Sequence, residues 1–319
     1  MCYSAQVWAD YRRYCREFGA ELSIRDFVEI YGLRSSQSQV KIPRSMDAAF
    51  ADPGTADELL IRQLIDEYNA GQIAQLEQEA FKQKKRLADA ERALLVKVTK
   101  KDTESQRIAG NKVEQALSRL ADLKRAEAKP KDSRIFPRWY APVLVVEDGR
   151  RIVKPMRYQC RPVGKPAFYD TKYPGTYNAR RDNLEGFWRG QFGYTHGVMV
   201  VNRFYENVSR HAMEGRELAP GEVEENVVLE FKPNPEHDML IACLWSRWTG
   251  AGEPDLLSFA AITDEPPAEV RAAGHDRCII AIKPENVDAW LNPDPANLVG
   301  LYRILDDKDR PYYEHRLAA

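Results

Sequence analysis

Hydrophobic residues near the N-terminus recur at the spacing of an amphipathic helix. Four of them lie 4, 3 and 4 residues apart, which puts them on one helix face. These residues are Val7, Tyr11, Tyr14 and Phe18. Gly19 comes next, as is common where a helix ends, and Ser23 can cap a second helix that runs to Gly32. The pattern predicts two short helices followed by a loop over residues 35–54.

The pattern changes between residues 57 and 128, where Ala, Leu, Glu, Gln, Lys and Arg dominate and proline is absent. In the first half, steps of 3 and 4 alternate as in the seam of a coiled coil. The seam consists of Ile73, Leu76, Ala80, Gln83, Leu87, Ala90 and Leu94. A second run covers residues 113–123, after a predicted break over residues 99–110. We expect an inserted antiparallel helical hairpin over residues 55–130, acting as a spacer, a self-association arm or a docking arm for a protein partner rather than in catalysis.

After residue 130, hydrophobic and aromatic residues come in short runs, many of them separated by Gly, Pro, Asn or Asp, which is typical of strands and turns. The runs cover residues 142–146, 197–204, 227–231, 239–245, 257–263 and 278–282. Helical patterns are sparse and cover residues 183–191 and 285–291. The sequence predicts an α+β fold with a mainly antiparallel sheet or partial barrel and peripheral helices. We expect one domain over residues 1–319, with a core formed by about 1–54 and 131–319.

The 319-residue chain is 44% hydrophobic and 30% charged, the composition of an ordinary globular protein. No run approaches the ~20 apolar residues of a membrane helix, and the N-terminus lacks the features of a signal peptide. Five scattered cysteines without a Cys-x-x-Cys pair argue against a disulfide framework and a zinc site. We expect a soluble cytoplasmic protein without a metal, an organic cofactor or a membrane partner.

Basic residues are concentrated between residues 150 and 181, although the net charge of the chain is −1. Nine are found there, opposed only by Asp170: Arg150, Arg151, Lys154, Arg157, Arg161, Lys165, Lys172, Arg180 and Arg181. The aromatic residues of the segment are Tyr158, Phe168, Tyr169, Tyr173 and Tyr177. Because cations bind phosphates and rings stack on bases, the segment is typical of a surface for single-stranded nucleic acid. A solvated basic face is the alternative.

Cys2 directly follows the initiator methionine. Cysteine is small enough for that methionine to be removed, which would give Cys2 both an α-amine with a reference pKa near ~7.7–8.0 and a thiol near ~8.5. An amine and a thiol on adjacent carbons condense with an aldehyde to a thiazolidine ring. The same terminus also suits an N-terminal-nucleophile hydrolase. Chance placement of the cysteine is the alternative.

Three further residues supply the proton-transfer and hydrogen-bonding groups that such a nucleophile needs. His275 lies just before the predicted strand at residues 278–282, Glu206 ends another apolar run, and Asn178 lies inside the basic segment. Taken singly, each has an ordinary structural explanation, such as an ion pair or a turn cap. Together with Cys2 they form a candidate acid–base site.

These residues stand in motifs that resemble, in order, those of the SRAP (SOS-response-associated peptidase) family. The motifs are Cys2, Asn178-Ala179-Arg180, Phe204-Tyr205-Glu206 and His275-Asp276-Arg277. Three landmarks agree with them: Tyr140-Ala141-Pro142, Pro155-Met156-Arg157-Tyr158 and Ala242-Cys243-Leu244-Trp245. The resemblance covers the N-terminal tip and most of residues 139–291.

The resemblance implies covalent capture of abasic sites in single-stranded DNA, with a nucleoid-associated location when DNA is bound. It implies that Cys2 forms the thiazolidine, that Glu206 orients the amine and moves protons, and that His275 helps the deoxyribose to open. It further implies that Asn178 binds in the pocket. Arg180 would bind a flanking phosphate, and the other strand contacts would come from Arg157, Tyr158, Arg161 and Arg181.

The chain also departs from the family pattern. It begins Cys2-Tyr3-Ser4 where members usually have Cys-Gly-Arg, it has Tyr158-Gln159 in place of Trp-Gly, and Asn207 replaces a Trp. Two further hypotheses therefore stay open. One is a thiol autopeptidase or amidohydrolase in which Cys2 attacks an acyl group, and the other is a non-enzymatic scaffold that binds single-stranded DNA.

Overall fold

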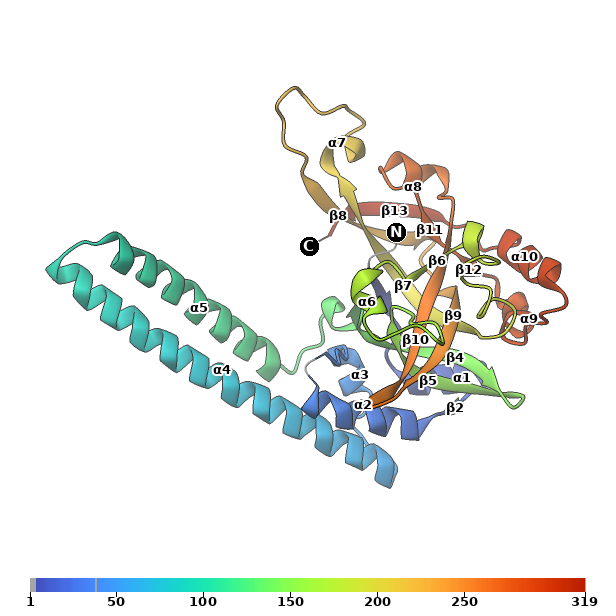
Figure 1. Ribbon diagram of the computed structural model, residues 1–319, viewed down its shortest axis with the longest axis horizontal. Helices are drawn as coiled ribbons and strands as arrows, with labels where there is room; N and C mark the ends of the chain where they lie inside the picture. Colours follow the sequence, from blue (N-terminus) through green and yellow to red (C-terminus); the bar gives the residue numbers. More distant parts are fainter. Residues whose placement is uncertain (1–3, 38, 319) are drawn as a thin grey trace. The chain divides into compact units, whose positions relative to one another are not determined.

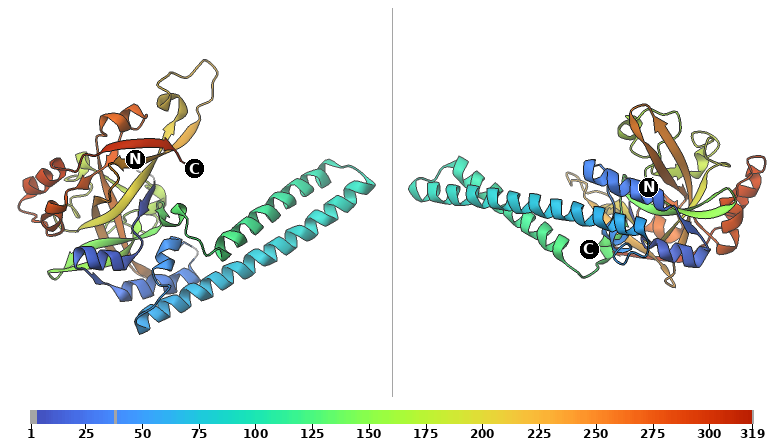
Figure 2. Two further views of the ribbon diagram at one scale, coloured as in Figure 1. Left: turned by 180° about the vertical axis from the view of Figure 1, so that it is seen from behind. Right: turned by 90° about the horizontal axis from the view of Figure 1, so that it is seen from below.

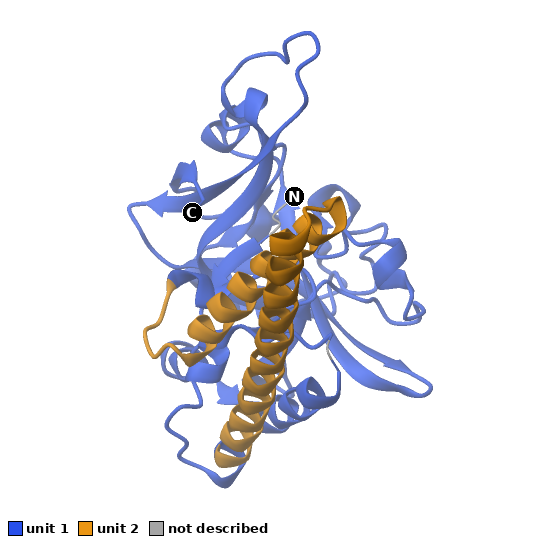
Figure 3. Cartoon of the chain, turned by 90° about the vertical axis from the view of Figure 1, so that its left-hand side faces the viewer, with its two compact units in different colours: residues 1–58, 130–319 blue, residues 59–129 orange. Residues whose placement is uncertain are grey.

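The computed structural model describes residues 4–37 and 39–318 (Figure 1). The chain divides into two compact units, residues 1–58 with 130–319 and residues 59–129 (Figure 3). The first unit holds the sheet, and the second holds most of a long helical hairpin. Across the described ranges, no helix combines the length and apolar character needed to cross a membrane.

Five strands of the sheet close into a ring. Their order is β7 (His196–Ser209), β4 (Tyr140–Glu147), β5 (Arg150–Tyr158), β10 (Glu253–Asp264) and β9 (Met239–Gly250), which pairs with β7 again. Every neighbouring pair is antiparallel except β5 with β10, which is parallel. Side chains of all five strands contribute to one buried core. The predicted α+β fold with a mainly antiparallel partial barrel is thereby confirmed.

Shorter strands extend the ring on several sides. Antiparallel pairs join β1 (Ser4–Val7) to β7 and β3 (Arg134–Ile135), and β8 (Asn226–Asn234) to β7 and β13 (Tyr312–Leu317). Parallel pairs join β2 (Glu21–Leu22) to β5 and β6 (Asn178–Arg180) to β10. The pattern at residues 278–282 gives two short strands, β11 (Cys278–Ile279) on β10 and β12 (Ala281–Ile282) on β9. β7 therefore has β1 and β8 beside the half that carries Glu206.

The first N-terminal helix begins later than the hydrophobic pattern predicts, whereas the second begins directly after Ser23, as predicted. Helix α1 (Tyr11–Phe18) starts after Asp10, whose side chain accepts a hydrogen bond from the Arg12 amide and caps the helix. Val7 belongs to β1 instead, because its main chain pairs with β7. Helix α2 (Ile24–Ser36) is longer than predicted, and α3 (Arg44–Ala48) lies within the predicted loop.

The remaining helices of the first unit are short. They are α6 (Tyr169–Lys172), α7 (Arg210–Met213), α8 (Ala268–Ala272), α9 (Val287–Leu291) and α10 (Leu298–Asp306), with 3-10 turns at Pro130–Ser133, Arg181–Asn183 and Pro284–Asn286. The predicted helix over 183–191 does not form. The Asn183 side chain accepts a hydrogen bond from the Phe187 amide and occupies the space beside Gly186, so the chain continues as a series of turns.

The hairpin consists of α4 (Ala56–Val96) and α5 (Lys100–Lys124), which run side by side (Figure 2). Buried small and aliphatic side chains line the contact: Ala80, Ala90, Ala109, Val113, Ala116 and Leu120. The break between the helices is shorter than predicted, because Thr99 caps α5 by accepting a hydrogen bond from the Asp102 amide. Residues 100–110 are therefore helical.

Candidate active site

Glu206 lies on β7, where that strand pairs with both β1 and β8. In the pairing of β7 with β1, Ser4 lies opposite Tyr205. In the pairing of β7 with β8, Leu229 lies opposite Glu206. The Glu206 side chain is completely buried, with 0% exposure. A carboxylate taken out of water in this way is costly unless other groups stabilise it, so its surroundings determine its chemistry.

His275 is held by the turn that follows α8. Gly274 has a φ of +93°, a conformation that favours glycine, and an added Cβ would lie only 3.1 Å from Ala212. The His275 amide donates to the Val270 carbonyl, and the imidazole Nδ1 lies 2.7 Å from the Arg277 carbonyl oxygen. These contacts fix both the backbone and the ring of His275.

The Nε2 atom of His275 lies 3.3 Å from Oε2 of Glu206. The Arg277 amide is 3.3 Å from Nδ1, but the carbonyl contact is shorter and a carbonyl oxygen can only accept, so Nδ1 carries a proton. When the imidazole is neutral, its Nε2 atom therefore carries a lone pair that faces the carboxylate of Glu206. The two groups are therefore compatible when one proton is shared between Nε2 and Oε2.

Burial lowers the pKa of His275, because the surroundings disfavour the charged imidazolium. A proton between the two groups would thus be held by a weakened base beside a buried carboxyl group. Two such groups can exchange a proton with a reacting molecule at low energetic cost, which is the requirement for general acid–base catalysis.

Cys2 lies outside the described residues. Ser4, the first described residue, is fully buried, and its Oγ accepts a hydrogen bond of 3.0 Å from Arg134 Nε. The Arg134 guanidinium also lies over the Tyr205 ring, 3.7 Å from its centre. These contacts tie the start of β1 to the residue directly before Glu206.

Asn178 lies on β6, opposite Ala261 of β10, and is 5% exposed. Its Oδ1 accepts a hydrogen bond of 3.5 Å from the Tyr158 hydroxyl, while its buried Nδ2 has no hydrogen-bond partner among the described residues. Asp182, just after β6, pairs with both Arg180 and Arg277. This ion-pair network connects the end of β6 to the turn that carries His275.

The structure places Tyr158, Arg157 and Arg161 inside the protein. Tyr158 is 1% exposed and packs against Phe259, so its ring cannot stack on a base in this conformation. Arg157 and Arg161 both pair with the Asp170 carboxylate, at 2.8 and 2.6 Å. Although burial would raise the pKa of Asp170, its hydrogen bonds to these guanidinium groups lower it below the usual value. Arg157 and Arg161 thus hold the loop that carries Asp170.

Two of the predicted cations reach the surface. Arg180 has a side chain that is 49% exposed and pairs with Asp182. Arg181 is 26% exposed and pairs with Asp264 and Asp306.

Sequence reasoning missed the Arg134 contact with Ser4, for which the sequence holds no signal. For the buried contact of Asp170 with Arg157 and Arg161, the sequence holds one signal. Asp170 is the single acidic residue between residues 150 and 181, where nine residues are basic.

In the residues that the structure describes, no group of three or more His, Cys, Asp or Glu side chains is arranged to hold a metal ion. The fold and the site define an α+β protein whose sheet closes into a ring and whose buried Glu–His pair can transfer protons.

Residues 97–315, more than half of the chain, match the family model described as SOS response associated peptidase (SRAP). The chain belongs to the SRAP family. The matched region contains Asn178, Glu206 and His275 but begins after Cys2.

Three of the solved structures to which the chain is similar come from bacteria. A protein from Bordetella bronchiseptica has 16% identity and a TM-score of 0.46, covering 61% of this chain and 90% of its own. A protein from Bacteroides thetaiotaomicron has 13% identity and a TM-score of 0.44, covering 59% and 78%. A phage-related protein from Bordetella bronchiseptica has 18% identity and a TM-score of 0.44, covering 61% and 84%. No curated protein matches the chain.

Proposed function

We propose that this SRAP family member captures abasic sites in single-stranded DNA through a covalent bond to Cys2, exposed by removal of Met1. The observation that carries the proposal is the buried contact of 3.3 Å between Glu206 and His275. A shared proton at this place is suited to the condensation of an amine with a sugar aldehyde, which needs both a base and an acid.

The path of β1 supports Cys2 as the reacting residue. Ser4 pairs with Tyr205, next to Glu206, and only two peptide units separate Ser4 from Cys2. Two residues of extended chain span about 7 Å, so Cys2 is within reach of the Glu206 neighbourhood.

The other cysteines support the same choice. The structure describes Cys15, Cys160, Cys243 and Cys278 as free thiols, and burial raises the pKa of each of them. Since the thiolate is the nucleophile, these four residues are poorly suited to attack a carbon centre.

The proposed reaction forms two bonds to the aldehyde carbon and releases one water. The Cys2 amine adds to the carbonyl, and loss of water from the adduct gives an imine. The Cys2 sulfur then adds to the imine carbon, while the nitrogen gains the proton that the thiol loses. His275 would first move the proton of the anomeric hydroxyl to the ring oxygen, which opens the sugar. Glu206 would then accept a proton from the amine as it attacks, and His275 would donate one proton to the departing hydroxyl.

In this proposal, exposed cations contact the DNA strand. Arg180 lies two residues from Asn178 and would bind a phosphate, whereas Asn178, with its free Nδ2, would donate a hydrogen bond to the sugar. Phosphate contacts carry no base information, so replacing Arg180 by Gln should weaken the binding of intact and damaged strands alike.

The test begins with the mass of the intact protein, because retained Met1 would exclude a thiazolidine at Cys2. The protein is then incubated with single-stranded oligonucleotides that carry or lack one abasic site, and the products are separated on a denaturing gel. We expect a lesion-dependent adduct that is absent for Cys2→Ala. The absence of any adduct from a protein that lacks Met1 would refute the proposal.

Two other outcomes correspond to the remaining hypotheses. Turnover of peptides or amides through an acyl-enzyme at Cys2 would indicate a thiol peptidase, the activity in the family's name. Salt-sensitive binding of single strands without a covalent product would indicate a non-enzymatic scaffold.

A further inference from the structure

Charge is distributed unevenly along the helical hairpin. Its distal half, residues 80–112, carries ten basic and four acidic side chains, a surplus of six positive charges. The rest of the second unit, residues 59–79 and 113–129, has more acidic than basic residues. The surplus cations are therefore confined to one end of the hairpin, in a chain whose net charge is −1.

Most of these distal cations form no ion pair with a described residue. Arg92 pairs with Asp89 and Arg107 pairs with Glu104. The other eight are Lys82, Lys84, Lys85, Arg86, Lys97, Lys100, Lys101 and Lys112, and no ion pair involves them within residues 4–37 and 39–318. In the proximal half, by contrast, Arg62 pairs with Asp66 and Lys124 pairs with Glu77. The distal surplus is thus available to an external anion.

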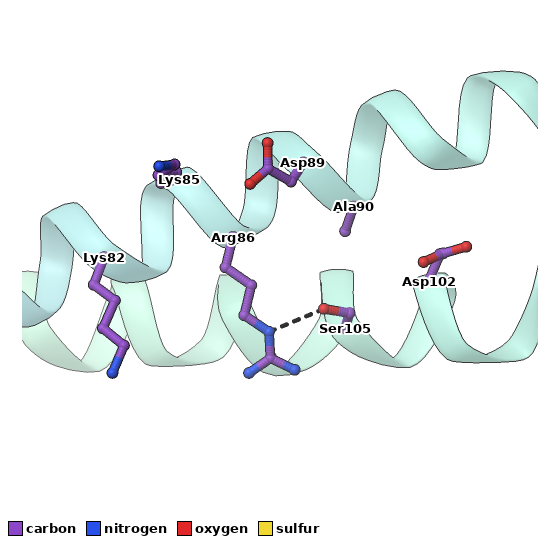
Figure 4. Close-up of a pocket in the computed structure, with 7 residues that line it drawn as sticks. All are labelled: Lys82, Lys85, Arg86, Asp89, Ala90, Asp102 and Ser105. Carbon is purple, nitrogen blue, oxygen red and sulfur yellow. Dashed lines mark hydrogen bonds between the residues drawn. The ribbon is translucent and has the colours of Figure 1, made fainter.

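Three of the eight line one cleft between α4 and α5. The cleft has a volume of about 320 Å³ and is lined by Lys82, Lys85, Arg86, Asp89, Ala90, Asp102 and Ser105. Figure 4 shows Lys82 and Arg86 directed from α4 toward α5, where Arg86 Nε donates to Ser105 Oγ at 2.9 Å. Both carboxylates are already engaged, Asp89 with Arg92 and Asp102 with Thr99. The cleft therefore carries a net positive charge that suits an anionic group such as a phosphate.

An exposed aromatic ring accompanies these cations. Phe81 is 74% exposed, although it lies in the middle of a long helix. Lys84 and Lys85 follow it by three and four residues, so all three share one helix face. An exposed ring beside cations is the combination that binds unpaired bases together with their phosphates. A duplex would offer the phosphates but not the base faces.

We propose that the distal half of the hairpin binds undamaged single-stranded DNA, with phosphates at Lys82, Lys85 and Arg86 and a base stacked on Phe81. The distal basic residues of α4, from Lys82 to Arg92, extend over about 15 Å of helix, a length that spans several phosphates of a strand. This binding needs neither a lesion nor Cys2, so it is independent of the covalent chemistry proposed above.

The experiment measures the affinity of the full chain for a fluorescent oligothymidine of 20 nucleotides, by fluorescence anisotropy between 50 and 200 mM NaCl. The variant K82Q/K85Q/R86Q removes the three cations of the cleft. We expect at least tenfold weaker binding at 50 mM NaCl and a slope of log K against log salt that is smaller by about 2, since each phosphate contact contributes about 0.7 for single strands. Circular dichroism checks that the helices persist.

The matched control is R62Q/R119Q/K124Q, which removes the same charge from the proximal half of the hairpin. We expect its affinity to stay within twofold of the wild type. Equal weakening in both triple variants would show that net charge alone matters and would overturn the proposal. Unchanged binding in the distal variant would overturn it as well.

A second pair of measurements tests the aromatic contact. Phe81→Ala should weaken oligothymidine binding severalfold but leave unchanged the binding of a tetrahydrofuran oligomer, which has phosphates without bases or aldehydes. Equal effects on both oligomers would overturn the stacking assignment. Sedimentation velocity of the wild type and the distal variant tests a competing occupant: a change in self-association without a change in DNA affinity would assign this surface to a second copy of the chain.

The two proposals can fail separately. Cys2→Ala should bind oligothymidine as the wild type does, because the hairpin makes no use of the thiol. Loss of capture with retained binding would contradict the abasic-site proposal alone. Retained capture with unchanged binding in K82Q/K85Q/R86Q would contradict the hairpin proposal alone.

Discussion

His275 Nε2 and Glu206 Oε2 lie 3.3 Å apart, with the Glu206 side chain fully buried and that of His275 only 8% exposed. His275 comes from a turn after α8, and Glu206 comes from the C-terminal half of the sheet strand β7. A contact between a buried base and a buried acid, so distant in sequence, indicates a site organised for proton transfer. The first prediction concerns this pair.

Glu206→Gln should slow covalent capture by about 10²- to 10⁴-fold, the usual contribution of a general acid or base. The amide keeps the shape of the carboxyl group but cannot take up the shared proton. The measurement is the single-turnover rate of adduct formation with an abasic oligonucleotide at several pH values. A rate within threefold of the wild type at every pH would exclude a catalytic role for Glu206.

A second buried glutamate provides the control. Glu230 on β8 is 7% exposed and accepts hydrogen bonds from Tyr205 and Arg203. Glu230→Gln should lower the free energy of unfolding, because it removes the charge that pairs with Arg203. The capture rate should change less than tenfold. Equal losses of rate in both variants would assign the effect to the sheet rather than to the reacting carboxyl.

The sheet could be predicted from the sequence where a strand is mostly apolar, as in β4, β9 and β10. The strand β5 is absent from the apolar runs because four basic residues interrupt it, at positions 150, 151, 154 and 157. One of them, Lys154, is 4% exposed and is balanced by Glu147 and Asp26. Glu147 lies on the neighbouring strand β4, but Asp26 lies on α2, far from Lys154 in sequence, so no local pattern contains this second contact. The predicted break at 99–110 failed for a similar reason, since Ala109 packs in the hairpin and supports a helix through a polar run.

The second prediction concerns the buried carboxylate between two arginines. Asp170 is 5% exposed and contacts both Arg157 and Arg161. Asp170→Asn should lower the free energy of unfolding by about 3–5 kcal/mol, because it leaves buried guanidinium groups without their counter-charge. Urea unfolding measures this change.

Asp182→Asn is the matched control for that substitution. Asp182 also pairs with two arginines, but its side chain is 55% exposed. Exposed ion pairs contribute about 0–1 kcal/mol, so this variant should unfold almost as the wild type does. Similar losses in both variants would contradict the structural role assigned to Asp170.

The third prediction concerns Gln159, whose φ of +124° favours glycine. Its side chain partly compensates the strain by donating to the Asp170 carbonyl at 2.9 Å and accepting from Arg138. Both Gln159→Ala and Gln159→Gly lose these bonds, but only glycine relieves backbone strain of about 1–3 kcal/mol. The glycine variant should therefore be the more stable of the two, the reverse of the ordinary preference for alanine of about 0.5–1 kcal/mol. Thermal unfolding of the pair decides the sign.

The candidate site shows a different limit of sequence reasoning. The family resemblance relates Glu206 to His275, but no spacing between them in the sequence predicts their contact. The charge count locates a basic segment but cannot tell which of its cations face inward. Burial depends on the partner that a side chain finds after folding, and Asp170 is that partner for both Arg157 and Arg161.

The fourth prediction concerns pH and a histidine outside the site. His196 is 2% exposed, its Nδ1 donates to the Trp290 carbonyl, and its Nε2 accepts from the Gly193 amide. Burial lowers the pKa of His196 to about 3, whereas an unfolded histidine has a value near 6.5. Below pH 6.5 the unfolded chain therefore binds a proton that the folded protein refuses, and stability falls as the pH falls.

Between pH 7 and pH 5 this single group should cost about 2 kcal/mol of folding free energy. His275, whose pKa is also lowered, acts in the same direction. His196→Asn keeps a donor for the Trp290 carbonyl but does not titrate, so it should be less stable at pH 7 and show a shallower decline toward pH 5. Urea unfolding at half-unit steps of pH measures both slopes. Parallel slopes would mean that His196 is protonated in the folded protein, in conflict with the hydrogen bond that its Nε2 accepts.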